Sequence, residues 1–139
     1  MNLERKWIAW CFGSWMLLAG AAAIAQPIEP LLDQAIAGNH RSRADKARDQ
    51  YRHPRETLLF FGLKPDMTVV EIWPAAGWYA EILAPVLRDK GQYYLAHVAI
   101  ENPRLENWQR DSRERLETRL ARTPALYGKP VFTSRSEEH

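Results

Sequence analysis

The sequence contains very little cysteine and almost no excess charge. Its one cysteine, Cys11, lies in an apolar stretch near the N-terminus, so the rest of the chain has no thiol. A disulfide framework, a cysteine nucleophile and a thiolate metal site are therefore excluded beyond that stretch. The formal net charge of +2 argues against nucleic acid or an anionic membrane surface as the main partner.

The sequence also lacks the local motifs of several common functional classes. It has no phosphate loop with Gly-Lys-Ser/Thr and no Ser–His–Asp arrangement. The four histidines, His40, His53, His97 and His139, do not show the spacing of a metal site. We therefore expect no bound metal.

The N-terminus has the three-part pattern of a secretory signal peptide. A charged start is followed by an apolar run from Trp7 to Ile24, and Ala23-Ile24-Ala25 has small residues at both outer positions. The pattern predicts cleavage after Ala25 and an exported, periplasmic or secreted protein that leaves the membrane. The alternative is an uncleaved helix that anchors the chain, because the run approaches the ~18–20 residues that span a bilayer.

Residues 26–62 are predicted to form a helical lead-in to one small domain. Apolar residues from Leu31 to Ile36 recur at helical spacing, Ser42 and Asp45 resemble a capping box, and Pro54 suits the first turn of another helix. We expect that last helix to bury Leu58, Leu59 and either Phe60 or Phe61. The charged middle helix contains Arg48, Asp49 and Arg52, which could clamp a carboxylate, although ion pairing on the helix surface is the simpler interpretation.

Residues 63–139 alternate strands with helices, which predicts an α/β fold with parallel strands and right-handed crossovers. The strands are expected at residues 68–73, 93–98 and 130–134, and the helices from Trp78 and from Asn102-Pro103. The side of the first strand that carries Val70 and Ile72 suits a buried sheet. Pro85 should kink or end its helix. Trp73, Trp78 and Trp108 are most simply core residues, and of these only Trp78 is well placed to border a ligand.

The loop between the first strand and its helix is built from small residues. Ala75, Ala76 and Gly77 would allow a ligand carboxylate or phosphate to approach backbone N–H groups at the start of the helix. An ordinary strand–helix turn fits the spacing equally well. A dinucleotide site is disfavoured, because the segment lacks the Gly-x-Gly-x-x-Gly register.

The segment from about Ala47 to Gly91 resembles a group of exported class I S-adenosylmethionine-dependent methyltransferases. The resemblance lies in Val69-Val70-Glu71-Ile72-Trp73-Pro74-Ala75-Ala76-Gly77-Trp78-Tyr79, which is similar to the first motif of that group. It also lies in Arg48-Asp49, Arg52-His53-Pro54 and Glu56-Thr57-Leu58, which are similar to the preceding block. The resemblance implies a Rossmann-like fold with a seven-stranded sheet and helices on both faces.

The same resemblance implies a set of cofactor-binding residues. Glu71 matches the acidic residue that helps to position the methionine portion of S-adenosylmethionine, and Ala75, Ala76 and Gly77 match the glycine-rich turn beneath it. His97 stands where an acidic residue commonly binds the ribose hydroxyls, with Glu101 a few residues further on. Trp73 and Trp78 flank the turn and complete the set. The sequence departs from the family pattern at Ala75 and Ala76, where glycine is usual, and at His97.

The length of the chain limits the expected function. Residues 63–139 would hold only the first half of a Rossmann-like methyltransferase domain, so the expected protein is a truncated methyltransferase with an unknown acceptor and no identifiable catalytic residue. The alternative is a non-catalytic exported remnant or interaction module with the same half fold. The open edge of such a sheet also predicts self-association.

Overall fold

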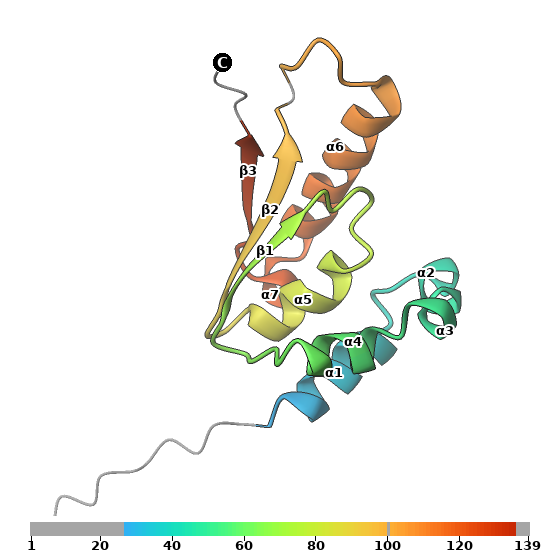
Figure 1. Ribbon diagram of the computed structural model, residues 1–139, viewed down its shortest axis with the longest axis vertical. Coiled ribbons are helices and arrows are strands. Elements are labelled where there is room, and N and C mark those ends of the chain that lie inside the picture. The colour runs from blue at the N-terminus through green and yellow to red at the C-terminus, as the bar shows by residue number, and fades with distance from the viewer. Residues whose placement is uncertain (1–26, 100, 136–139) are drawn as a thin grey trace, which may run out of the picture.

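The computed structural model describes residues 27–99 and 101–135 (Figure 1). The predicted signal peptide at residues 1–25 lies outside the described residues. Among the helices of these residues, none combines the length and the hydropathy of a membrane-spanning segment.

Four helices precede the sheet, one more than the sequence predicted, because the expected charged middle helix is divided at Arg48 into two short helices. They are α1 (Ile28–Ala37), α2 (Arg43–Ala47), α3 (Asp49–Arg52) and α4 (Pro54–Phe60). The Ser42 hydroxyl accepts a hydrogen bond from the backbone N–H of Asp45 at 3.0 Å, which caps α2 as the sequence indicated. Pro54 occupies the first turn of α4, where its missing N–H costs nothing.

The remaining elements form a mixed α/β unit around a three-stranded parallel sheet. The strands are β1 (Thr68–Ile72), β2 (Gln92–Val98) and β3 (Val131–Arg135), and they are ordered β1-β2-β3. Helix α5 (Ala80–Leu87) connects β1 to β2, and α6 (Asn107–Arg122) and α7 (Pro124–Tyr127) connect β2 to β3. The predicted parallel pairing is confirmed, with Val70 opposite Tyr94 and Tyr94 opposite Val131.

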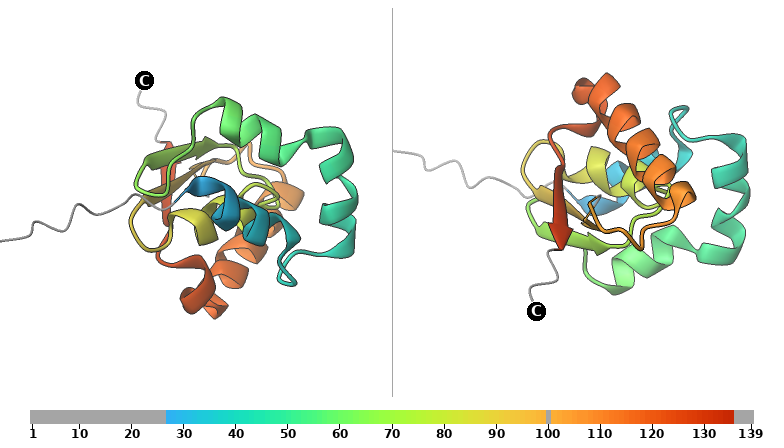
Figure 2. Two further views of the ribbon diagram at one scale, coloured as in Figure 1. Left: turned by 90° about the horizontal axis from the view of Figure 1, so that it is seen from below. Right: turned by 90° about the horizontal axis from the view of Figure 1, so that it is seen from above.

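Both long crossover helices lie on one side of the sheet (Figure 2). On that side, Tyr93, Leu95 and His97 of β2 are buried, and they face a core formed largely by α5 and α6. On the other side, Val70 is 57% exposed and Ile72 is 82% exposed. The expectation that Val70 and Ile72 are buried is therefore wrong. It assumed the two-sided covering typical of parallel sheets, whereas the described helices cover one face.

Two further expectations about helices are corrected by the structure. Helix α6 begins at Asn107 and not at Asn102-Pro103, because Glu106 and Gln109 form a reciprocal capping box at its start. Phe60 and Phe61 are both exposed, since α4 ends at Phe60 and turns Pro54 and Leu58 inward, with Leu59 partly buried against the core.

Pro85 lies inside α5, which ends two residues later at Leu87. A proline at this position cannot donate to the carbonyl of Glu81, four residues earlier. The Nε2 of His40 lies 2.8 Å from that carbonyl oxygen and replaces the missing donor. The helix thus continues through Pro85 for two residues, and the carbonyl that the proline leaves unpaired is satisfied from another segment of the chain.

Candidate functional site

The loop after β1 turns sharply at the carboxyl edge of the sheet. Trp73, Ala75 and Gly77 have positive φ angles of 61°, 48° and 84°. The backbone N–H of Gly77 donates to the carbonyl of Pro74 at 2.7 Å, which closes a tight turn. Left-handed backbone favours glycine, so the alanine and tryptophan hold this shape at an energetic cost.

Gly77 also allows α6 to approach the loop. A Cβ atom placed on Gly77 would lie 2.3 Å from Cδ1 of Leu116, which is fully buried on α6. Arg119 of α6 donates to the carbonyl of Ala76 at 2.7 Å and pairs with the buried carboxylate of Glu81. The small residues of this loop therefore allow α6 to pack closely against it, in addition to leaving its backbone accessible to a ligand.

The first turn of α5 is already occupied by hydrogen bonds within the loop. The N–H of Glu81 donates to the carbonyl of Gly77, and those of Ile82 and Leu83 donate to the carbonyl of Tyr79. These three amides are not free for an anion. The expected anion site at the start of this helix is thus limited to the loop residues before Ala80.

Glu71 lies at the end of β1 on the side of the sheet that faces the helices. Its carboxylate accepts a hydrogen bond from the hydroxyl of Tyr93 on β2. Burial raises the pKa of Glu71 above its ordinary value, and the Tyr93 hydrogen bond and the nearby charge of Arg52 oppose this rise.

Trp78 lies at the other end of the loop and is a core residue, as predicted, with 5% exposure. Its indole N–H donates to the carbonyl of Asp45 at 2.9 Å and so ties the loop to α2. Two guanidinium groups lie over its ring, with the Cζ atoms of Arg41 and Arg52 at 5.4 Å and 4.7 Å from the ring centroid. Helices α2 and α3 are thereby held beside the loop (Figure 1).

The charged segment around Arg48 forms ion pairs in part, as the simpler interpretation expected. Asp49 binds the buried Arg41 through two hydrogen bonds of 2.7 Å. Nη1 of Arg48 lies 3.9 Å from Oδ1 of Asp45. The sequence gives no signal that would identify Arg41 as part of this cluster, because Arg41 follows a turn and belongs to no periodic pattern. Arg52 forms neither a hydrogen bond nor an ion pair through its side chain within the described residues.

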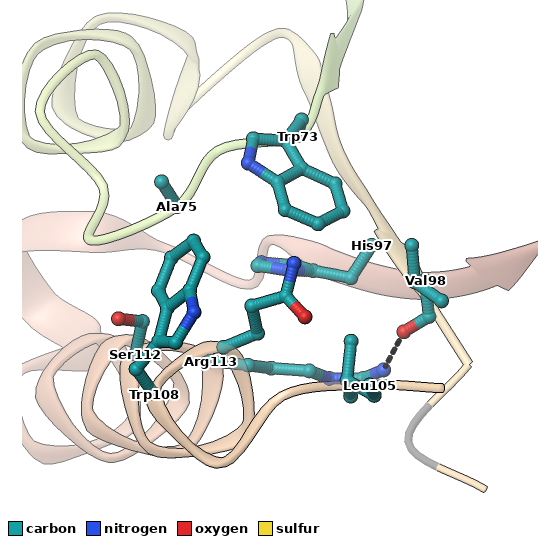
Figure 3. Close-up of a pocket in the computed structure, with 9 residues that line it drawn as sticks. Trp73, Ala75, His97, Val98, Leu105, Trp108, Ser112 and Arg113 are labelled. Carbon is teal, nitrogen blue, oxygen red and sulfur yellow. Dashed lines mark hydrogen bonds between the residues drawn. The ribbon is translucent and has the colours of Figure 1, made fainter. Parts of the chain in front are cut away.

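A small cavity lies at the carboxyl ends of β1 and β2, where the sheet meets the start of α6 (Figure 3). Its volume is about 10 Å³, which is room for at most one water molecule. Trp73 and Trp108 lie on opposite sides of it, and they are 42% and 56% exposed. The core positions expected for these two tryptophans are wrong, because both indoles lie at the rim of this cavity. The cavity is lined by Trp73, Ala75, His97, Val98, Leu105, Trp108, Gln109, Ser112 and Arg113.

His97 is the buried polar group of the cavity. The residue is 8% exposed, and its Nε2 has no hydrogen-bond partner. Its ring stacks on Phe132 of β3 with the centroids 6.2 Å apart. Burial, together with the charge of Arg113, lowers the pKa of His97, and Glu117 opposes this effect. The imidazole is therefore neutral at pH 7 and carries an unsatisfied nitrogen.

The structure distributes the predicted site residues over two sides of one loop. Trp73, Ala75 and His97 line the cavity, together with Trp108, Gln109 and Ser112 from α6, which the sequence did not identify as site residues. Glu71 and Trp78 lie with Arg52 on the side of α2 and α3. Gly77 and Ala76 join the two groups and contact α6. Among the described residues, no group of three potential ligands could hold a metal ion.

Comparison with known proteins identified no relative of this chain. No family model matches the chain, and no curated protein and no solved structure is significantly similar to it.

Proposed function

We propose that this protein binds S-adenosylmethionine at the carboxyl edge of β1 and β2 and is a methyltransferase with a Rossmann-like fold. The observation that carries the proposal is the unpartnered Nε2 of His97, in a cavity flanked by two tryptophans. A buried polar atom without a partner is costly, and a ligand hydroxyl would satisfy it. The cavity adjoins the loop whose residues resemble a methyltransferase cofactor loop.

The chemistry of the site suits an adenosine group. Indole rings stack on nucleobases, and a neutral imidazole can donate or accept one hydrogen bond to a ribose hydroxyl. Because the cavity is about 10 Å³, Trp73 and Trp108 must separate when such a ligand enters. Their exposure leaves room for this movement into solvent.

Methyl transfer requires little covalent chemistry from the protein itself. The reaction is an in-line displacement, so the protein contributes mainly by positioning the reactants and by a fitting electrostatic environment. Glu71, the loop at residues 73–77 and His97 would position the cofactor, while the acceptor remains unassigned.

Calorimetry with S-adenosylmethionine and S-adenosylhomocysteine tests this proposal. We expect both to bind at one site and NADH to give no heat. His97→Phe keeps the ring stack on Phe132 but removes the nitrogen, so affinity should fall roughly 10-fold. The matched control is Tyr94→Phe on the opposite face of β2, which should bind as the unmodified protein does. Absence of heat with either compound at high protein concentration would contradict the proposal.

A second candidate function is a non-catalytic interaction module. It is favoured by the exposed apolar face of the sheet, where Val70 and Ile72 lie, since such faces commonly mark protein contacts. This candidate predicts no response to either cofactor compound, and that result separates the two proposals.

A further inference from the structure

The open face of the sheet is uncharged at the strand positions whose side chains the structure describes. Every second residue of each strand points to this face, and the residues between them point to α5 and α6 (Figure 2). The residues on the open face are Thr68, Val70, Ile72, Gln92, Tyr94, Ala96, Val98, Val131 and Thr133. Because 26% of all residues in the chain are charged, this surface differs in composition from one adapted to water.

A parallel sheet with one bare face is unusual. Parallel strands occur almost only in sheets whose two faces are both covered, whereas the described helices cover one face here. Val70 and Ile72 are 57% and 82% exposed, and exposed apolar patches commonly mark contact surfaces. An acidic or basic partner would find no opposite charge at these positions. The partner that fits is another uncharged, apolar surface, and the same face of a second copy is such a surface.

The middle strand presents a bulky residue and a small one in succession on this face. Tyr94 and Ala96 are neighbours there on β2, the central strand of the sheet. In the rows across the sheet, Tyr94 lies opposite Val70 and Ala96 lies opposite Ile72. Two residues along a strand are ~7 Å apart, so a large ring and the space above a methyl group lie side by side at the centre of the face.

We propose that two copies of this chain pack face to face through this surface, with Tyr94 of each copy over Ala96 of the other. A two-fold axis between the sheets, at right angles to the strands and level with Leu95, exchanges these two positions, as a symmetric contact requires. The same axis places Val70 of one copy opposite Ile72 of the other. Apolar groups are then covered on both copies without the burial of a charge at these positions.

The size of the face determines the expected strength of this contact. At ~3.3 Å per residue and ~4.8 Å between strands, three strands of five residues cover roughly 240 Å². Stable interfaces bury about 800 Å² on each partner. We therefore expect a weak dimer whose population depends on protein concentration.

This contact is independent of the two other proposals that concern the sheet. It leaves the edge of β1 unpaired, so it differs from association through that edge. It also does not rest on the proposed function, because His97 and α6 lie on the other side of the sheet.

Sedimentation of the full chain, up to millimolar concentration, tests the contact. Tyr94→Lys and Ala96→Glu each place a charge within it and should weaken the dimer roughly 10- to 100-fold. Tyr51→Lys is the matched control. It makes the same exchange on α3, where Tyr51 is 78% exposed, and should leave the dimer unchanged. Every variant retains residues 1–26, so association caused by those residues would be equal in all of them.

A mixture of the two charged variants tests the register. In the mixed dimer, the introduced ammonium group lies over the introduced carboxylate, and the second contact keeps its original Tyr94 and Ala96. The mixture should therefore dimerise more tightly than either variant alone. Circular dichroism checks the fold of each variant.

A measurement on the unmodified protein needs no substitution. In nuclear magnetic resonance, the methyl signals of Ile72 and Ala96 should shift as the protein concentration rises. Those of Leu31, which is 37% exposed on α1, should not shift.

Three results would overturn the inference. If the unmodified protein is monomeric at every concentration, a second copy does not cover this face. If both charged variants dimerise as the unmodified protein does, the copies associate through another surface. If the mixture dimerises no better than its components, Tyr94 does not lie over Ala96 of the other copy.

Discussion

At the scale of single residues, the loop after β1 stores backbone strain. Trp73 and Ala75 have φ angles of 61° and 48°, and neither is glycine. A left-handed conformation costs an L-residue roughly 1–2 kcal/mol. Helix α6 packs on this loop at Gly77, and Arg119 binds the carbonyl of Ala76, so the surrounding contacts maintain the strained shape.

Ala75→Gly is expected to stabilise the protein. The substitution removes the left-handed strain but adds about 0.4–1 kcal/mol of backbone entropy to the unfolded chain. The free energy of unfolding should therefore rise by about 0.5–1 kcal/mol, measured by urea denaturation. Ala76→Gly is the control, because Ala76 has no positive φ and its replacement should only destabilise. A lower stability for Ala75→Gly would show that the loop is not strained at this position.

Glu71→Gln is expected to change how stability depends on pH. Burial raises the pKa of Glu71 above its ordinary value of 4.5. The stability contributed by the protonated carboxyl is complete below the unfolded pKa and is lost as the pH rises through the folded pKa. Glutamine keeps an acceptor for Tyr93 without the buried charge.

The variant should accordingly unfold at a higher temperature than the unmodified protein at pH 7 and at nearly the same temperature at pH 4. Thermal unfolding followed by circular dichroism at the two pH values measures this difference. An equal or lower unfolding temperature for the variant at pH 7 would contradict the interpretation that burial destabilises the Glu71 carboxylate.

At the scale of elements, α5 depends on a residue outside it. Pro85 leaves the carbonyl of Glu81 without its helical donor, and Nε2 of His40 binds that carbonyl at 2.8 Å. His40→Ala should therefore cost about 1 kcal/mol. In a Pro85→Ala background, the restored N–H can bind the carbonyl, so the same His40 substitution should cost less.

A double-mutant cycle of these two substitutions in chemical denaturation measures the coupling. We expect a coupling of about 0.5–1 kcal/mol. Strictly additive effects would mean that His40 stabilises the protein only through other contacts, such as its ring contact with Tyr127.

The order of helices and strands could be predicted from the sequence, whereas the face that each of them buries could not. Hydrophobic periodicity and the positions of Pro54 and Gly62 located the helices and strands, and their alternation correctly predicted the parallel pairing. The exposure of Val70 and Ile72 could not be predicted, because β-branched residues suit a covered and an uncovered face of a strand equally well.

The candidate site, too, could be predicted from the sequence only in part. The loop at residues 73–77 is visible as a run of small residues, and His97 follows from its place at the end of a strand. Arg41, Trp108 and Arg113 reach the loop or the cavity only through packing between elements distant in the sequence. Local patterns carry no signal for such contacts, so three-dimensional information was needed to identify these residues.

At the scale of the whole molecule, one face of the sheet remains apolar and uncovered by the described helices. Ile72 is 82% exposed there and lies on β1, at an edge of the sheet. We expect the protein to self-associate at high concentration through this strand, because an unpaired edge readily adds another strand. Ile72→Lys places a charge at the edge and should shift the protein toward monomer.

Sedimentation over a range of protein concentrations measures this effect, and circular dichroism checks that the variant keeps its fold. Arg55→Lys, which leaves the apolar face untouched, is the control. If the unmodified protein is monomeric at every concentration, the edge of β1 is not an association surface.

The central claim is that a nucleoside cofactor binds between the loop after β1 and the start of α6. Titration of isotope-labelled protein with S-adenosylhomocysteine, followed by nuclear magnetic resonance, tests it most directly. We predict that the indole N–H signals of Trp73 and Trp108 shift together with the amides of Ala75 and Gly77, while the amides of β3 beyond Phe132 change little. Unchanged signals at Trp73 and Trp108, or shifts confined to the face with Val70 and Ile72, would contradict the claim.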